Sequence, residues 1–325
     1  MYFDRARRIF ICATMLAVAL TGGLAQAASL PESKEPIKIA LNEWTGQNVT
    51  AKLLGKIYEN MGYTVDYVTA GAMPQFTAMA EGTLTVQPEV WTNLVGDAYP
   101  KALASGAITE LGLLGLNNYE GWAYPRYMEQ LCPGLPKLDA LIACKDLIAT
   151  PETFPNGRIL AYPADWGTQS QKLVEGMKLP FTAVPAGSEG AEVAEIKAAF
   201  LKTQPLVLMF WRPHWIHAEY DLGFIDVEPP YSDACATDPA VGPNPDSVDD
   251  CSFPQAKVVK AAWSGMAKTW PAAFKVLERF QFDGAEQSKL VFEIDQKGRA
   301  LDEVVAEWLQ RHEAEWKSWA EAAAR

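Results

Sequence analysis

The sequence predicts an α/β protein of two lobes, each with a mixed, mostly parallel sheet flanked by helices. Apolar runs of strand length alternate with stretches in which apolar residues recur at helical spacing. The chain has 325 residues, more than a single hydrophobic core usually holds together. Several of the strand-length runs also end at a tryptophan beside turn-forming residues. Because ligands of open α/β sheets bind beyond the carboxyl ends of the strands, these tryptophans indicate a binding site.

The N-terminal part of the chain predicts a β-α-β unit followed by one more helix and strand. The expected elements are a strand at 37–41, a helix at 49–61, a strand at 63–68, a helix at 74–81 and a strand at 82–91. Two strands joined by a helix form a parallel pair with a right-handed crossover by default. Trp44 follows the first strand and Trp91 ends the third, so both indoles are expected at one end of the sheet.

A second set of elements begins at an extended aromatic segment, 117–125, where we expect the chain to cross between the lobes. The elements expected after it are a loop-rich interval at 126–150, a strand at 158–162, a helix that ends near 176, a helix at 191–203, a strand at 206–211 and a returning strand at 222–227. Trp166 follows the strand at 158–162. Trp211 ends the apolar run at 206–211, which Pro213 keeps from continuing.

The N-terminus and the crossing segments together predict the domain organisation. Arg5, Arg7 and Arg8 precede an apolar run and a small-residue site at 25–27, a pattern typical of a signal peptide. We therefore expect a signal peptide at 1–27, one lobe formed by 28–118 plus 225–325, and a second lobe formed by 119–224. No later apolar run reaches the about 20 residues of a membrane helix, so a soluble periplasmic protein is expected.

Four cysteines follow the signal peptide, at Cys132, Cys144, Cys235 and Cys251. Disulfides persist in exported proteins, and among the three possible pairings we favour the two local ones, Cys132–Cys144 and Cys235–Cys251. Zinc ligation is the alternative. Neither pair has the short spacing of zinc sites, however, and the chain has only three histidines.

Residues 229–254 are rich in Pro, Asp and Asn, and the second disulfide would close them into a surface insertion. Oxygen-bearing side chains crowd this segment, at Asp233, Asp238, Asn244, Asp246, Asp249 and Asp250. Calcium prefers such ligands, so a structural calcium site is one prediction, although EF-hand spacing is missing. A loop fixed only by its disulfide is the other. We expect no cofactor to be required.

From Gln255 onward the sequence predicts helices with one break, at 280–284. Five tryptophans in this part recur at helical spacing, at Trp263, Trp270, Trp308, Trp316 and Trp319. This spacing indicates packing rather than contact with a ligand.

The tryptophans expected near strand ends together suggest an aromatic cage, formed by Trp44, Trp91, Trp122, Trp166 and Trp211. The face of each ring presents negative potential to a cation. A trimethylammonium group cannot donate strong hydrogen bonds, so it is the kind of ligand that such a cage recognises best. The net charge of −12 makes nucleic acid and anionic membranes poor partners.

Trp44, Trp91 and the element Trp211-Arg212-Pro213-His214-Trp215, in this order, resemble the glycine betaine/choline-type substrate-binding proteins of ABC importers. The likeness extends over nearly the whole chain after the signal peptide. It implies a type II periplasmic-binding-protein fold with two crossover strands, and a membrane permease as partner. We expect a monomer. The resemblance also implies ligand contact by Trp44, Trp91, Tyr119 and Trp211, with Trp122 and Trp166 as further walls.

Two positions depart from that family. Gly46 stands where the choline-binding branch has an aspartate, and Arg212 where the family usually has a small polar residue. The acidic partner of the ligand is then expected from Glu120 or, as the alternative, from Glu43. The pattern is also similar to the branch that binds trimethylamine N-oxide, which is the favoured ligand, with glycine betaine and choline close behind.

Two other functions fit parts of the sequence. His214, His217 and Asp221 lie close together in the chain, and a hydrolase would use such residues with a serine. No G-x-S-x-G, H-E-x-x-H or glycine-rich phosphate loop occurs, so we expect no enzymatic activity. A secreted carbohydrate-binding protein is the other alternative, because tryptophan faces also stack on sugars.

Overall fold

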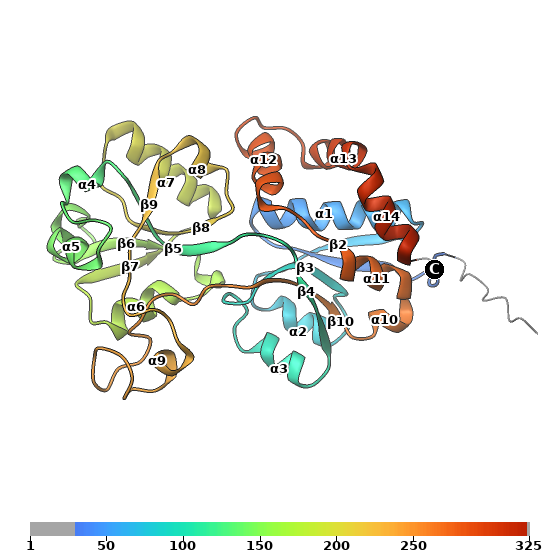
Figure 1. Cartoon of the computed structure of the whole chain (residues 1–325), viewed down its shortest axis with the longest axis horizontal. Helices are drawn as coiled ribbons and strands as arrows, with labels where there is room; N and C mark the ends of the chain where they lie inside the picture. The colour runs from blue at the N-terminus through green and yellow to red at the C-terminus, as the bar shows by residue number, and fades with distance from the viewer. Residues whose placement is uncertain (1–29, 324–325) are drawn as a thin grey trace, which may run out of the picture.

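The computed structural model describes residues 30–323 and shows two lobes, each built on one five-stranded sheet (Figure 1). The strands of the first-lobe sheet are β1 (Ile37–Leu41), β2 (Val65–Thr69), β3 (Val86–Trp91), β4 (Ile108–Leu113) and β10 (Val258–Trp263). Those of the second-lobe sheet are β5 (Tyr119–Pro125), β6 (Gly157–Ala161), β7 (Phe181–Pro185), β8 (Leu208–Arg212) and β9 (Leu222–Phe224). Helices flank both sheets, which confirms the predicted fold class. The signal peptide predicted at 1–27 lies outside the described residues.

Helices surround the sheets in both lobes. Those of the first lobe are α1 (Thr45–Asn60), α2 (Gln75–Ala80), α3 (Ala98–Ala104), α10 (Met266–Thr269), α11 (Pro271–Arg279), α12 (Gly284–Asp295), α13 (Leu301–Arg311) and α14 (Glu313–Ala323). The others are α4 (Met128–Leu131), α5 (Leu138–Ala143), η1 (Lys145–Leu147), η2 (Ala164–Trp166), α6 (Gln169–Gly176), α7 (Glu189–Lys202), α8 (Ile216–Glu219) and α9 (Asp233–Thr237). Between residues 30 and 323, no helix combines the length and apolarity that crossing a membrane requires.

The two sheets share one topology, in which two parallel strand pairs are followed by two antiparallel ones. The first sheet runs β2-β1-β3-β10-β4, and β10 is antiparallel to both of its neighbours. The second runs β7-β6-β8-β5-β9, and β5 is antiparallel to both of its neighbours. In each lobe, this antiparallel strand is the first one after the chain has crossed from the other lobe: β10 follows β9, and β5 follows β4. The predicted parallel pair β1–β2 is confirmed.

The C-terminal segment departs from its prediction at β10. Helices were expected from Gln255 onward, but residues 258–263 form a strand between β3 and β4, so the prediction is wrong for this stretch. Trp263 accordingly ends a strand and does not lie on a helix. The physical reason is Lys260, whose charge interrupts the apolar run by which a buried strand is recognised in a sequence.

Lys260 is accommodated in this strand by hydrogen bonds to the end of a helix. Its side chain is 1% exposed, and Nζ donates to the carbonyl oxygens of Glu278 (2.8 Å) and Phe280 (2.7 Å). α11 ends at Arg279, so these carbonyls belong to a helix C-terminus, which attracts a positive charge. Burial lowers the pKa of Lys260 to about 8.

Both predicted disulfides are present, which confirms the pairs Cys132–Cys144 and Cys235–Cys251. The first lies beside α4 and α5, and the second closes the insertion between β9 and β10.

The insertion is attached to the second lobe (Figure 1). Asn244 Nδ2 and Ser247 Oγ both donate to the carbonyl oxygen of Gly176 at the end of α6, at 3.2 and 2.7 Å. The sequence assigned this segment to the first lobe by placing the boundary after Phe224. That boundary stays a prediction, but the insertion itself is bonded to the other lobe.

Replacing Lys260 with methionine should destabilise the protein, because the carbonyl oxygens of Glu278 and Phe280 lose their donor. We expect the free energy of unfolding, measured with urea, to fall by about 1–3 kcal/mol, the usual cost of stranding buried polar groups. Lys257→Met is the matched control, since Lys257 is exposed next to the same strand. It should change the free energy by less than about 0.5 kcal/mol. Equal losses in the two variants would contradict the role assigned to Lys260.

Candidate ligand-binding site

Aromatic rings from both lobes meet around a small cavity between the two sheets. It is lined by Trp44, Trp91, Leu94, Glu120, Tyr162, Trp166 and Trp211. The first three of these residues belong to the first lobe and the other four to the second. The cavity is therefore complete only where the lobes are in contact.

The rings of this cage contact one another mainly edge to face. The ring centres of Trp166 and Trp211 are 5.7 Å apart, and Tyr162 lies 5.5 Å from Trp166 and 5.7 Å from Trp211. Trp44 of the first lobe reaches Trp166 at 5.1 Å, across the gap between the lobes. These separations are typical of aromatic pairs.

Each cage tryptophan lies where a strand ends. Trp91 is the last residue of β3, and Trp211 is the last but one of β8. Trp44 follows β1 at the start of α1, and Trp166 lies in η2, shortly after β6. β1 and β3 are parallel, as are β6 and β8, so in each lobe the two indoles share one edge of the sheet.

Glu89, which is not among the site residues predicted from the sequence, holds the two first-lobe indoles. Its Oε1 accepts hydrogen bonds from Nε1 of Trp44 (3.2 Å) and Nε1 of Trp91 (3.0 Å). Oε2 accepts from Thr50 Oγ1 (2.6 Å) and Gln287 Nε2 (2.7 Å). Burial raises the pKa of Glu89, and these hydrogen bonds oppose the shift. One signal was available, since Glu89 and Trp91 are two residues apart in a strand and so share a face.

Buried amide side chains fix the turn that carries Trp44. The backbone N–H of Asn42 donates to Gln47 Oε1 at 2.9 Å, and Gln47 Nε2 donates to Gln87 Oε1 at 2.9 Å. Gln87 Nε2 in turn donates to Asn42 Oδ1 at 2.7 Å and to Gln75 Oε1 at 2.6 Å. This network ties the end of β1 to β3 and α2, which holds the turn in place.

Glu120 is the acidic residue of the cavity wall. It is 1% exposed and accepts hydrogen bonds from Tyr162 Oη (3.0 Å) and from Asn93 Nδ2 (2.5 Å), the latter across the lobes. Burial raises the pKa of Glu120 to about 7, although both hydrogen bonds act to lower it. Glu43, the alternative acidic partner, is exposed and does not line the cavity.

The structure thus brings together five of the seven residues expected at the site, Trp44, Trp91, Glu120, Trp166 and Trp211. Tyr162, which the sequence analysis had placed only at a strand end, supplies the phenol ring of the cage. Tyr119 lies outside it. Tyr119 precedes Glu120 in β5, so its side chain is on the opposite face, where it is 40% exposed and contacts Phe224 at 4.8 Å.

Trp122 also lies outside the cavity, in the core of the second lobe. It is fully buried, its ring centre is 5.9 Å from Phe181 and 5.6 Å from Phe253, and Nε1 donates to Ser170 Oγ at 3.0 Å. Trp122 shares a strand face with Glu120 but lies two residues further from the strand end. The expectation that it forms a wall of the site is therefore corrected to a packing role.

The histidines considered for a hydrolase support the end of β8. His217 Nε2 donates to the carbonyl oxygen of Trp211 at 2.9 Å, and burial lowers the pKa of His217 to about 4. His214 lies against the ring of Trp211, with centres 5.2 Å apart, and its Nε2 bonds to Glu189. Both histidines thus have partners that position the cage.

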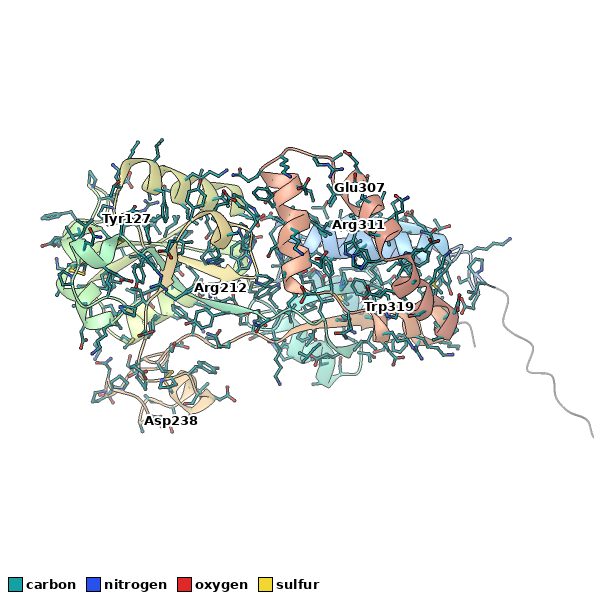
Figure 2. All side chains as sticks on the ribbon, turned by 45° about the horizontal axis from the view of Figure 1, so that its top comes forward. Tyr127, Arg212, Asp238, Glu307, Arg311 and Trp319 are labelled. Carbon is teal, nitrogen blue, oxygen red and sulfur yellow. A yellow bond between two sulfur atoms is a disulfide. The ribbon has the colours of Figure 1, made fainter. Side chains whose placement is uncertain are left out.

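The six residues predicted as calcium ligands occupy different surroundings in the insertion. Asp238 lies towards its outer end (Figure 2). Asp249 pairs with Lys172 at 3.6 Å, whereas Asp250 is fully buried and accepts from the backbone N–H of Asn244 at 2.7 Å. Within residues 30–323, the acidic side chains of this segment form no group of three close enough to share an ion. The calcium site stays a prediction.

Comparison with known proteins identifies the family. Residues 35–311 match the substrate-binding domain of ABC-type glycine betaine transport systems. The chain belongs to this family. It is also 28% identical, over 311 residues, to the trimethylamine N-oxide-binding protein of Pelagibacter ubique (strain HTCC1062), covering 94% of this chain and 96% of that protein. The family that the sequence resembles is therefore confirmed.

Solved structures support the fold of this substrate-binding protein. An ABC-transporter choline-binding protein in complex with choline is similar with a TM-score of 0.71 and 17% identity, over 91% of this chain and 100% of that one. Lactococcal OpuAC in its closed-liganded conformation with glycine betaine is similar with a TM-score of 0.68 and 19% identity, over 88% of this chain and 99% of that one. The two-lobed architecture is common to all three.

Glu89→Leu should loosen the first-lobe half of the cage, because Nε1 of both Trp44 and Trp91 would lose its acceptor in a buried site. We expect the free energy of unfolding to fall by at least about 2 kcal/mol, and the tryptophan fluorescence to change. Glu81→Leu, at an exposed position of the same lobe, serves as the control and should change neither. Normal stability and fluorescence in Glu89→Leu would show that the rings do not depend on this carboxylate.

Proposed function

We propose that the protein is the periplasmic solute-binding component of an ABC importer and captures a small trimethylammonium-type compound, trimethylamine N-oxide being the favoured ligand. The observation that carries the proposal is the lining of the cavity. It consists of four tryptophans, one tyrosine, one leucine and one glutamate, without a basic side chain among these described residues. Ring faces attract a methylated cation, and a buried carboxylate adds Coulomb attraction.

The charges around the cage favour a ligand without a carboxylate. Glu120 is in the wall, and Glu89 and Glu189 line a small adjoining cavity together with Trp44 and Trp211. A carboxylate on the ligand would lie among like charges in a site from which water is excluded. This arrangement supports trimethylamine N-oxide and choline over glycine betaine.

The basic residues near the site are engaged elsewhere. The Arg212 guanidinium lies 5.1 Å from the ring centre of Phe224. Arg212 lies opposite Tyr119 in the pairing of β8 with β5, so the two side chains share one face of the sheet. Lys172 pairs with Asp249 of the insertion. Neither lines the cage, so neither offsets its negative charge.

Glu120 further supports the N-oxide. With a pKa of about 7, its carboxyl group is present in both protonation states near neutral pH. The ionised form attracts the methylated nitrogen, and the protonated form can donate a hydrogen bond to the oxide oxygen. The similarity to a trimethylamine N-oxide-binding protein over nearly the full length agrees with this choice.

Membership in the family supports the importer and the compartment. Substrate-binding proteins of ABC systems deliver their ligand to a membrane permease, and the predicted signal peptide would direct the chain to the periplasm.

A carbohydrate ligand is less well supported. Among the described side chains that line the cavity, Glu120 and Tyr162 carry the oxygen atoms, and these two residues are bonded to each other.

Calorimetric titration with trimethylamine N-oxide, choline, glycine betaine and glucose tests the proposal. Trimethylamine N-oxide should bind most tightly, glycine betaine least tightly of the three methylated compounds, and glucose not at all. Trp211→Ala should weaken binding at least about tenfold, because a desolvated cation–π contact is worth ~2 kcal/mol. Trp319→Ala is the control, since Trp319 lies on the first lobe far from the cage (Figure 2). No binding of any methylated compound would reject the proposed function.

Binding of tetramethylammonium, whose charge does not titrate, should become tighter as the pH rises from about 6 to about 8. The cation stabilises the ionised form of Glu120, and the pKa of Glu120 of about 7 means that this form becomes dominant within that window. Protons should be released on binding, which titration in buffers of different ionisation enthalpy detects. Glu120→Gln should abolish the dependence. An affinity that is constant, or that falls with rising pH, would contradict contact between Glu120 and the cation.

A further inference from the structure

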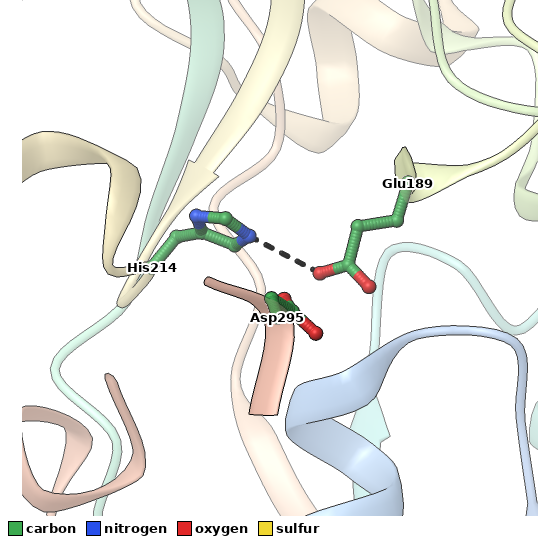
Figure 3. A group of neighbouring side chains, drawn as sticks. All are labelled: Glu189, His214 and Asp295. Carbon is green, nitrogen blue, oxygen red and sulfur yellow. Dashed lines mark hydrogen bonds and ion pairs between the residues drawn. The ribbon is translucent and has the colours of Figure 1, made fainter. Parts of the chain in front are cut away.

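A polar cluster borders the cage at the contact between the lobes, formed by Glu189, His214 and Asp295 (Figure 3). Glu189 is the first residue of α7 and His214 follows β8, both in the second lobe, whereas Asp295 ends α12 in the first. Ligand atoms of the three side chains lie within 4.8 Å of one another. Glu189 and His214 also line the small cavity that adjoins the cage.

Glu189 accepts hydrogen bonds from both lobes. Its Oε2 accepts from the backbone N–H of Thr45 at 2.9 Å, and its Oε1 from His214 Nε2 at 3.1 Å, the bond drawn in Figure 3. His214 Nδ1 accepts from the backbone N–H of Ile216 at 3.1 Å. The proton of a neutral His214 is therefore on Nε2, which donates to Glu189.

The backbone N–H of Thr45 has no hydrogen-bond partner within α1, and Glu189 supplies one from the opposite lobe. The residue at the N-cap of α1 is Trp44, and no side chain of the helix itself caps this end. Helix N-termini favour a carboxylate, because their first N–H groups lack partners and the helix dipole is positive there. Glu189 is 6% exposed, so the bond forms in a site that is nearly dry.

Asp295 joins the lobes at the same place. Its Oδ1 accepts from Thr45 Oγ1 at 2.8 Å, and its Oδ2 accepts from Nε1 of Trp215 in the second lobe at 3.1 Å. Thr45 directly follows the cage residue Trp44. The position of that indole is thus tied to the contact between the lobes.

We propose that Glu189 determines ligand specificity, because its carboxylate occupies the donors beside the cage that a carboxylate on the ligand would use. A helix N-terminal N–H and a histidine N–H are favourable partners for a carboxylate. A betaine whose methyl groups lay in the cage could reach them only by displacing Glu189, and would otherwise face its like charge. Glu189 thereby reserves the cage for trimethylammonium compounds that lack a carboxylate. This inference rests on the proposed function and names the residue that enforces it.

Titration of Glu189→Ala and Glu189→Gln with glycine betaine and trimethylamine N-oxide tests the inference. Glu189→Ala frees both donors, so the affinity for glycine betaine should rise relative to that for trimethylamine N-oxide by about tenfold or more, equivalent to about 1.4 kcal/mol. Glu189→Gln should give a smaller rise, since its amide oxygen still accepts one hydrogen bond. Glu192→Gln is the matched control. Glu192 lies buried on the same helix but lines neither the cage nor the adjoining cavity, so the ratio should not change.

Several outcomes would overturn the inference. One is a ratio within about twofold of the parent in both Glu189 variants, with thermal unfolding showing that they fold. Another is an equal loss of affinity for both ligands, which would mean that Glu189 only joins the lobes. If Glu189→Ala does not fold, the isosteric Glu189→Gln decides. Failure of the parent protein to bind any methylated compound would instead reject the proposed function, and the parent titrations alone detect that result.

Discussion

The binding site depends on carboxylates that are buried among indole rings. Glu89 holds Trp44 and Trp91 by the N–H groups at their ring edges, and Glu120 holds Tyr162 by its hydroxyl group. A carboxylate removed from water is costly unless it is hydrogen bonded or paired with a cation. The same groups therefore orient the rings and favour a positive charge between them. Shape and charge at this site have one physical origin.

The cage is divided between the lobes, so their contact assembles it. Asn93 of the first lobe donates to Glu120 of the second, and Gln169 of the second lobe donates through Nε2 to the carbonyl oxygen of Asn93 at 2.8 Å. On the other side of the cage, Glu189 and Asp295 connect Thr45 with the second lobe. Membership in the family establishes the kind of protein, whereas the proposed choice among methylated ligands rests on the acidic residues around the rings.

What could be predicted from the sequence is what local signals encode. The end of a strand can be recognised from a short stretch of sequence, because the apolar run stops at a turn. Four cage tryptophans were placed at strand ends in this way. The face on which Tyr119 lies depends on the register of β5 against β8, which no short stretch of sequence encodes. Glu89 could be recognised only once Trp44 and Trp91 were known to approach the same carboxylate. Lys260 concealed β10 because its carbonyl partners lie some 20 residues further along the chain.

The place of β10 in the first-lobe sheet also determines when that lobe can be completed. Until residues 258–263 have been synthesised, β4 has no neighbouring strand, since β10 is its partner in the sheet. The five strands of the second lobe lie within residues 119–224 and are all available earlier. Pairing between segments so far apart is slow, because a long loop must close first. As the chain emerges N-terminus first, the lobe whose strands begin the sequence is the last to be finished.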